Sequence, residues 1–311
     1  MELSFFFPWE VALTEWLQAH MGAAAVTLAS LISMLGEQLP VVGIIGFLYW
    51  CYDKEYGRFL GVNLAAATVF NAMVKNMVFR RRPYCDHPSI RCLKPVEPKA
   101  DIYDLAAQGY SFPSGHSSTA VTAYGSLALC RPRPLLKLAA VLLPLLVGLS
   151  RVCLGVHYPT DVLAGWLLGL LVTFLVGALQ KRLRRLPLYL ILLLAGLPGW
   201  FFCRSTDFYS SYGLMLGLFA SVLFEARFVR FENTRCVPRA ILRLAAGIGL
   251  FLGLNALLKL PFRPEFLASV SFGARLVRTL RYALAAFAVM GLYPMLFRQT
   301  DRLWKREKTS G

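Results

Sequence analysis

Charged residues are scarce in this sequence. Of its 311 residues only 16% are charged, whereas 57% are hydrophobic and the mean hydropathy is +0.55. Soluble domains carry about 25% charged residues, so the composition excludes an ordinary soluble protein. The sequence also has no internal repeat and no low-complexity linker. We therefore expect one all-α integral membrane domain whose polar residues are concentrated in a few short stretches.

Histidine is rare as well, and the four residues are His20, His87, His116 and His157. None is paired with cysteines or acids at a spacing typical of zinc sites, so we expect no metal and no cofactor. His87 is interpreted as a solvated loop residue, and the alternative is that it touches the site from the long loop. Five of the seven cysteines lie at predicted span ends or in a predicted cytoplasmic loop and imply no disulfide framework. A bridge between Cys85 and Cys92 is a weaker hypothesis, with two free thiols as its alternative.

Acidic residues are outnumbered: 17 acids stand against 33 lysines and arginines, which gives a net charge of +16. In a membrane protein such an excess indicates cytoplasmic loops and contact with anionic lipids. The basic residues do not form one stripe interleaved with aromatic residues, so we expect no nucleic-acid partner. The opening stretch MELSFFFPWEVALTEWLQAHMG has acids where a signal peptide has basic residues, and it is interpreted as an interfacial segment.

Apolar runs long enough to cross a bilayer follow one another along the chain, since a spanning helix needs roughly 17–25 residues. Hydropathy and polar breaks predict nine transmembrane helices, at 37–52, 57–79, 116–130, 136–155, 160–180, 187–203, 208–226, 241–259 and 281–297. The run AAAVTLASLISML before Glu37 is ambiguous. It fits a re-entrant or surface helix, and it also fits an extension of the first span.

The basic residues are divided unequally between the two sets of loops, which predicts the orientation. If the first span runs inward, one side and the C-terminal tail hold 19 basic residues, and the other side holds 14. The positive-inside rule makes the first side cytoplasmic, so the N-terminus is expected outside and the C-terminus inside. Five cations within 259–281 lie on the side that this rule disfavours.

The first polar cluster is KNMVFRRRP, at the end of the second predicted span. Lys75 and Arg82 are seven residues apart, close to two helical turns, and are expected to project from one face. Pro83 then ends the helix. Arg80 and Arg81 are interpreted as ordinary positive residues at a membrane edge. Lys75 lies deeper in an apolar run, where it either snorkels to the surface or serves a function.

The second cluster is GYSFPSGHSSTA, directly before the third predicted span. Ser114 and Gly115 occupy the positions of a helix N-cap, so free backbone N–H groups and the positive end of the helix dipole point outward. Such a helix end binds anions. His116 follows in the first turn, within reach of the same anion. The alternative is a capped helix start without a ligand.

The third cluster is SRVCLGVHYPTD, between the fourth and fifth predicted spans. Pro159 suits the first position of a helix, which places His157 just before it and Asp161 in its first turn. An acid there can accept a hydrogen bond from the imidazole and fix its tautomer. A lone histidine at a helix end is usually structural, but Arg151 lies six residues upstream of this one.

Helix alternation brings the three clusters to one membrane face. Lys75, Arg82 and Arg151, together with a helix N-terminus, would form a site for a multiply charged oxyanion. The two histidines of the clusters would supply a nucleophile and an acid. The residues therefore predict a site for phosphate chemistry.

The clusters also match a known three-part signature: Lys-x6-Arg-Pro at 75–83, Pro-Ser-Gly-His at 113–116 and Ser-Arg-x5-His-x3-Asp at 150–161. In this respect the chain resembles the type 2 phosphatidic acid phosphatase superfamily, which also includes glucose-6-phosphatase and the vanadium haloperoxidases. The resemblance covers residues 50–180. The upstream stretch ISMLGEQLPVVGIIGFLYWCYDKEYG resembles the first segment of sphingosine-phosphate phosphatases and of related bacterial membrane proteins.

The resemblance implies a metal-independent phosphatase that works through a phosphohistidine. His157 would attack phosphorus, Asp161 would orient it, and His116 would protonate the leaving oxygen. The phosphoryl oxygens would be held by Lys75, Arg82, Ser114, Gly115 and Arg151. The expected organisation is an interfacial or re-entrant segment at 1–36, a catalytic membrane core at 37–185, and further transmembrane helices with a basic cytoplasmic tail at 186–311.

We therefore predict a membrane phosphatase that hydrolyses a lipid phosphate or lipid diphosphate. Its active site would face the extracytoplasmic or luminal side of a bacterial plasma membrane or the endoplasmic reticulum. A phosphotransferase with the same phosphohistidine is an alternative, as is a sugar-phosphate phosphatase like glucose-6-phosphatase, although that subgroup usually lacks the acid found here as Asp161. A transporter would need two matched halves with polar residues at the bilayer midplane, and no such repeat occurs. Hydropathy excludes a soluble haloperoxidase.

Overall fold

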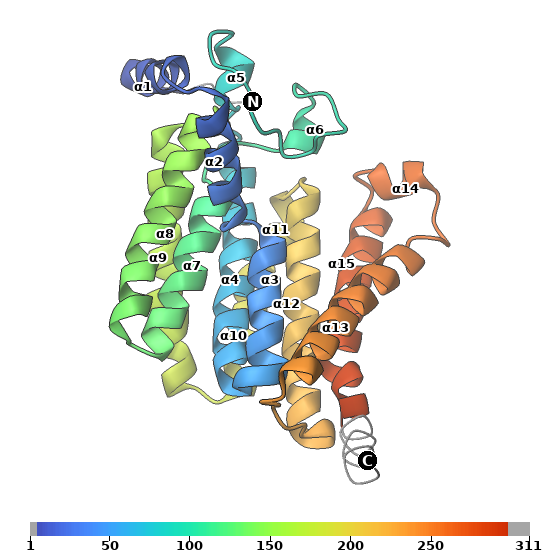
Figure 1. Cartoon of the computed structure of the whole chain (residues 1–311). Helices are drawn as coiled ribbons and strands as arrows, with labels where there is room; N and C mark the ends of the chain where they lie inside the picture. The colour runs from blue at the N-terminus through green and yellow to red at the C-terminus, as the bar shows by residue number, and fades with distance from the viewer. Residues whose placement is uncertain (1–4, 298–311) are drawn as a thin grey trace.

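The computed structural model describes residues 5–297, and every regular element in that range is helical (Figure 1). The first part of the chain forms α1 (Pro8–Ala19), α2 (Ala23–Met34), α3 (Gln38–Phe47), α4 (Lys54–Val78), α5 (Pro83–Asp86), α6 (Leu105–Gln108), α7 (Gly115–Cys130), α8 (Pro134–Cys153) and α9 (Pro159–Arg182). The second part forms α10 (Arg185–Gly196), α11 (Gly199–Phe202), α12 (Thr206–Phe224), α13 (Val237–Leu257), α14 (Pro264–Ala268) and α15 (Phe272–Phe287).

Single π-helical turns prolong three of these helices, at Leu48–Tyr52 after α3, Glu225–Val229 after α12 and Ala288–Leu292 after α15. A 3₁₀ turn at Tyr293–Leu296 follows the last of them. The predicted basic tail begins at residue 298 and lies outside the described residues.

Seven helices in the described range are long and apolar enough to cross a membrane: Lys54–Val78, Pro134–Cys153, Pro159–Arg182, Arg185–Phe202, Thr206–Val229, Val237–Leu257 and Phe272–Leu296. Each overlaps one predicted span. The predicted span 37–52 pairs with the ambiguous run before it, because Ala23–Met34 and Gln38–Tyr52 form a helix pair bent by 43°. The predicted span 116–130 is the 16-residue helix α7, which is packed among α4, α8 and α9. The predicted all-α membrane fold is confirmed: seven helices, or eight if the bent pair is one span, are long and apolar enough to cross a membrane, and the shorter α7 packs among them.

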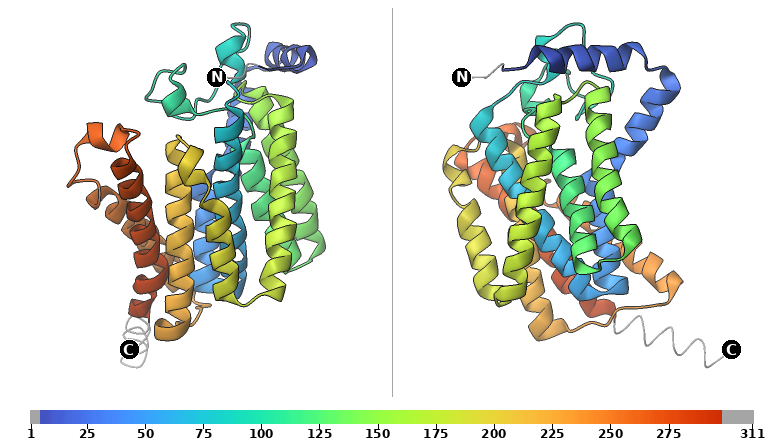
Figure 2. Two further views of the ribbon diagram at one scale, coloured as in Figure 1. Left: turned by 180° about the vertical axis from the view of Figure 1, so that it is seen from behind. Right: turned by 90° about the vertical axis from the view of Figure 1, so that its left-hand side faces the viewer.

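The alternation of helix directions brings the three polar clusters to one end of the bundle. The C-terminal ends of α4 and α8 and the N-terminal ends of α7, α9 and α12 lie at the end that also carries α1, α5 and α6 (Figures 1 and 2). The last described residues lie at the opposite end. The convergence inferred from alternation is therefore present in the fold.

Local sequence signals set the ends of the helices that carry the clusters. The Asp53 carboxylate caps α4 by accepting hydrogen bonds from the backbone N–H groups of Glu55 and Tyr56, each at 3.1 Å. The helix ends at Phe79, which has a left-handed φ of 53°. Proline at the first position starts both α8 and α9, where its missing N–H costs nothing.

A buried apolar cluster joins the three-motif core to the later helices. Val69 of α4, Tyr189 of α10 and Phe219 of α12 belong to it, and the rings of Tyr189 and Phe219 stack with centroids 4.3 Å apart. Helix α12 also packs along α4 and α15. The first turns of α12 therefore stand next to the end of α4 that carries Lys75.

Helix α1 has its polar side turned inward. Glu10, Thr14 and Gln18 recur every fourth residue and are buried, whereas Trp9 and Trp16 are 51% and 59% exposed. The helix runs across the end of the bundle (Figure 2). Tryptophan is enriched where proteins meet the headgroup region of a bilayer, so the outer face of α1 suits a membrane interface. This arrangement supports the predicted interfacial segment.

Candidate active site

One cavity of about 540 Å³ holds most of the predicted site residues. Six of the eight line it: Lys75, Arg82, Gly115, His116, Arg151 and His157. Ser114 and Asp161 are fully buried behind the lining, with no exposed surface. The structure therefore brings the eight residues to one place from α4, α7, α8, α9 and the turns between them.

Lys75 and Arg82 reach the cavity by different routes. The sequence placed them on one helical face, but α4 ends at Val78, so Arg82 lies beyond the helix, just before α5. The Lys75 ammonium donates a hydrogen bond to the carbonyl oxygen of Tyr110 at 3.1 Å. The predicted shared face is wrong because the left-handed Phe79 turns the chain before Arg82.

Arg82 links two loops by hydrogen bonds in this structure. Its guanidinium donates to the carbonyl oxygens of Gln108 at 2.7 Å, Gly109 at 3.0 Å and Val156 at 2.9 Å. Burial lowers the pKa of this arginine below its ordinary value. Arg82 thus positions the loop before α7 and the turn before His157, and a role in holding phosphate stays a prediction.

The N-terminus of α7 has the expected cap. Ser114 accepts a hydrogen bond from the hydroxyl of Ser117 at 2.8 Å, and its own N–H donates to the carbonyl oxygen of Asp161 at 2.9 Å. The N–H groups of the first turn have no partner within a helix, and Gly115 and His116 line the cavity there. This is the arrangement that favours an anion.

Two close approaches place this helix end. A Cβ atom at Gly165 of α9 would lie 2.5 Å from the carbonyl oxygen of Ser114. A Cβ atom at Gly36, between α2 and α3, would lie 2.8 Å from the carbonyl oxygen of His116. Only glycine fits at either position without moving α7. Both glycines therefore help to fix the N-terminal end of α7.

Arg151 lies near the end of α8 and is 2% exposed. One terminal nitrogen donates to the hydroxyl of Ser33 at 2.7 Å. Its Nε atom has no hydrogen-bond partner among the described residues. A buried guanidinium with unused donor capacity suits an oxyanion that is held in the cavity.

His157 and Asp161 are adjacent, as predicted, and a third residue joins them. Nδ1 of His157 lies 3.5 Å from Oδ2 of Asp161 and 3.4 Å from Oγ of Ser111. The Ser111 hydroxyl donates to the same carboxylate oxygen, which also accepts from the Tyr158 N–H at 2.8 Å. The Nδ1 edge of the ring therefore faces the carboxylate, and Nε2 is the nitrogen left for chemistry.

The surroundings of His157 keep it neutral. Burial, followed by the positive charges of Arg82, Arg151 and Lys75, lowers its pKa well below 6.5. At neutral pH the ring therefore has an unprotonated nitrogen. A neutral imidazole is the form that can act as a nucleophile.

Sequence reasoning missed the group that holds Asp161 from behind. Arg80, interpreted as an ordinary edge residue, is fully buried and donates to Oδ1 of Asp161 at 2.6 Å and to Oε2 of Glu10 at 2.9 Å. Its guanidinium also lies over the rings of Phe5 and Tyr158, 4.3 and 4.0 Å from their centroids. The earlier interpretation of Arg80 is wrong because α1 covers it.

The sequence also predicted the surroundings of Arg81 and His87. Arg81 is partly exposed and lies 3.4 Å from Asp86, which fits an ordinary positive residue at a membrane edge. His87 is only partly exposed, and its ring lies edge-on to Phe6 with centroids 4.4 Å apart. The prediction of a solvated His87 is therefore wrong, since the N-terminal segment packs on it. Cys85 and Cys92 are both free thiols in the structure.

Residues 5–297 contain no group of three or more histidine, cysteine, aspartate or glutamate side chains placed to hold a metal ion.

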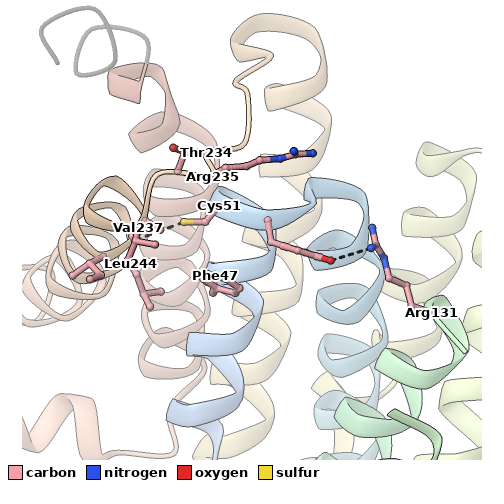
Figure 3. A pocket seen from close by; sticks show the side chains of 10 residues that line it. Phe47, Cys51, Arg131, Thr234, Arg235, Val237 and Leu244 are labelled. Carbon is pink, nitrogen blue, oxygen red and sulfur yellow. Dashed lines mark hydrogen bonds between the residues drawn. The ribbon is translucent and has the colours of Figure 1, made fainter. Parts of the chain in front are cut away.

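A second cavity, of about 510 Å³, lies at the other end of the bundle between α3 and α13 (Figure 3). Its lining includes Cys51, Arg131 and Arg235 but none of the predicted site residues. Arg131 is already paired with Asp53 at 2.6 Å. The first cavity is therefore the candidate active site.

Comparisons with known proteins identify the protein family to which this chain belongs. The sequence model of the PAP2 superfamily matches residues 56–185, and a model described as the transmembrane extension of PAP2 superfamily phosphatases matches residues 209–306. Phosphatidylglycerophosphatase B of Bacillus subtilis is 32% identical over 158 residues, which cover 47% of this chain and 70% of that protein. Undecaprenyl-diphosphatase of Sulfolobus acidocaldarius is 31% identical over 137 residues, covering 44% of this chain and 60% of that protein.

Lipid A 1-phosphatase of Rhizobium etli is 32% identical over 118 residues, covering 37% of this chain and 47% of that protein. A crystal structure of a transmembrane PAP2-type phosphatidylglycerolphosphate phosphatase from Bacillus subtilis matches with a TM-score of 0.44 and 27% identity, covering 57% of this chain and 87% of that one. The chain belongs to the PAP2 superfamily. It is a membrane phosphatase, as the resemblance had implied.

Proposed function

We propose that this enzyme hydrolyses a lipid phosphate or lipid diphosphate through a phosphohistidine and needs no metal. Nε2 of His157 attacks phosphorus, the bond to the leaving oxygen breaks, and His116 gives that oxygen its proton. Water then attacks the phosphohistidine, the N–P bond breaks, and His116 takes the proton from water. Phosphate leaves and the starting protonation states return.

The observation that carries this proposal is the placing of His157. Its Nδ1 edge is held by the Ser111 and Asp161 pair, and its ring lines the same cavity as Lys75 and Arg151. Those two cations, with the N-terminus of α7, would neutralise the phosphoryl oxygens while the ring attacks. Ser114 supports that helix end by capping it, and Arg82 supports both flanking loops.

A lipid substrate is supported by the relatives and by the place of the cavity. The three relatives named above carry the names of phosphatases of a phospholipid, a polyprenyl diphosphate and lipid A. The residues that line the cavity come from the end of the bundle that carries α1, whose tryptophans are exposed. An acyl or prenyl chain can stay in the bilayer while its phosphate reaches Lys75, and each buried methylene contributes about 0.8 kcal/mol to its retention.

We propose the orientation inferred from the loops, with the active site and N-terminus on the extracytoplasmic or luminal side and the C-terminus in the cytoplasm. The end of the bundle opposite the cavity carries the basic loops that contain Arg131, Arg184 and Arg235. The positive-inside rule places such loops in the cytoplasm. The division into segments at 1–36, 37–185 and 186–311 also stays a prediction.

The test is phosphate release from a panel of lipids and soluble phosphates in the presence of EDTA. The panel contains a prenyl diphosphate, a phosphatidate, a sphingoid phosphate and glucose 6-phosphate, each presented with the enzyme in nanodiscs. We expect full activity in EDTA and higher kcat/KM for lipids. Loss of activity in EDTA that Mg²⁺ restores would contradict metal independence. An equal or higher kcat/KM for glucose 6-phosphate would contradict the lipid assignment, and transfer of the phosphoryl group to another acceptor would indicate a phosphotransferase.

A further inference from the structure

The catalytic cavity is larger than the predicted phosphate site. Beyond the motif residues it is lined by Asn71 of α4, Ser118 of α7 and Ser211 of α12, and also by Arg204 and Asp207 at the start of α12. Most of helix α12, including Ser211, belongs to the transmembrane extension at residues 209–306, for which the sequence suggested no role. One wall of the catalytic cavity is thus supplied from outside the part of the chain that carries the three motifs.

Two side chains on the wall have hydrogen-bonding groups without partners. Asn71 is 6% exposed and Ser118 is 2% exposed. Nδ2 of Asn71 and Oγ of Ser118 make no hydrogen bond within the described part of the chain. Asn71 precedes Lys75 by one helical turn, and its Oδ1 atom lies 3.6 Å from the Cβ position of Gly115. Both groups therefore border the place where the phosphoryl group is expected.

Buried polar side chains in native proteins nearly always have hydrogen-bond partners. An amide and a hydroxyl that line a cavity without partners indicate a ligand that supplies them. Arg204 and Asp207 bring one charge of each sign, so the wall as a whole favours a neutral polar group over a second anion. A hydroxyl group can donate to Oδ1 of Asn71 and accept from its Nδ2 or from Ser118.

We propose that Asn71, Ser118 and Ser211 form a subsite for hydroxyl groups on the alcohol that leaves after the phosphorus–oxygen bond breaks. This inference rests on the proposed function. The favoured substrate is a phosphomonoester of a polyol, such as a glycerol or sugar unit, that is itself attached to a lipid. An ester of a plain prenyl alcohol would leave the amide and the hydroxyls without partners. The extension therefore contributes to substrate selection.

The test compares two lipid phosphates in the same nanodiscs: a phosphatidylglycerol phosphate and farnesyl phosphate. The readout is the ratio of their kcat/KM values, which is insensitive to the fraction of enzyme that is folded. We expect the wild-type ratio to favour the glycerol ester, and Asn71→Leu to lower the ratio about 10-fold through the lost hydrogen bonds. Ser118→Ala and Ser211→Ala should each lower it in the same direction.

Ser210→Ala is the matched control, because its hydroxyl donates to the Thr206 carbonyl oxygen at 3.0 Å and does not line the cavity. It should leave the ratio unchanged. If Asn71→Leu does not fold, the two serine variants decide. A wild-type preference for farnesyl phosphate, or an unchanged ratio in the subsite variants, would overturn the subsite while leaving the phosphatase intact. If the enzyme hydrolyses neither of these lipids but hydrolyses another lipid of the panel above, the subsite is overturned and the proposed function stands; if it hydrolyses no lipid of the panel, both fail.

Discussion

Replacing Arg80 by lysine removes most of the hydrogen bonds of the guanidinium that supports Asp161 from behind. The arginine donates to Asp161 at 2.6 Å, to Thr160 at 2.7 Å, to Glu10 at 2.9 Å and to the Phe5 carbonyl oxygen at 2.9 Å. Both carboxylates and the guanidinium are fully buried. A lysine ammonium keeps the charge but cannot reproduce the planar fork of the guanidinium, so at least one of the two carboxylates loses its cationic partner.

The size of the expected effect follows from the burial of these charged groups. Removing one partner of a buried ion pair costs about 3–5 kcal/mol, because an uncompensated charge is left in a medium of low dielectric. Part of this cost lowers the stability of the fold. The rest appears in turnover, because Asp161 and Ser111 then no longer hold the His157 ring in place, and a misplacement of about 1 Å costs roughly 10²-fold.

The assay is steady-state kinetics on one lipid phosphate together with thermal unfolding of the same samples. We expect Arg80→Lys to lower kcat by about 10²-fold and to change KM much less, since Arg80 does not line the cavity. Glu10→Gln should lower kcat by a smaller factor, because Arg80 still donates its hydrogen bond to Asp161. Arg81→Lys is the control, since Arg81 is partly exposed and lies 3.4 Å from Asp86. A folded Arg80→Lys enzyme with wild-type kcat, or an equal loss in the control, would refute the positioning role.

Three further predictions follow from the site. Between pH 7 and pH 6, kcat/KM on nitrophenyl phosphate, whose leaving group needs no proton from His116, should change little after correction for substrate ionisation, because the lowered pKa keeps His157 neutral; an ordinary histidine would lose about threefold. His116→Ala should lower turnover on an alkyl phosphate by about 10²–10⁴-fold, with partial rescue on nitrophenyl phosphate, whose leaving group needs no proton. A cysteine replacing the exposed Lys99 should react with an impermeant reagent in intact cells; reaction only after lysis would reverse the orientation.

The convergence of the three clusters could be predicted from the sequence, because helix alternation depends only on counting apolar runs. Residue spacing within a cluster also correctly predicted that His157 and Asp161 are adjacent, since they are one helical turn apart at the start of α9. It failed for Lys75 and Arg82, because a single left-handed residue ended α4 early. Backbone geometry at one residue leaves little trace in hydrophobic periodicity.

The support behind Asp161 could not be predicted from spacing. Glu10 and Arg80 are 70 residues apart in sequence, and their contact depends on how α1 crosses the end of the bundle. One signal was present: Glu10, Thr14 and Gln18 form a polar stripe of helical period in an aromatic segment. Such a stripe indicates an inward-facing polar side. Which residues it meets is decided by tertiary packing.

The central claim is that His157 carries the phosphoryl group during turnover. The direct measurement is rapid-quench trapping of the enzyme with a lipid labelled in the phosphate, followed by the stability of the label in acid and alkali. We expect a species that is labile in acid and stable in alkali in wild-type enzyme and His116→Ala, and none in His157→Ala. An undiminished labelled species in His157→Ala, with loss of it in His116→Ala, would reverse the two roles and contradict the account.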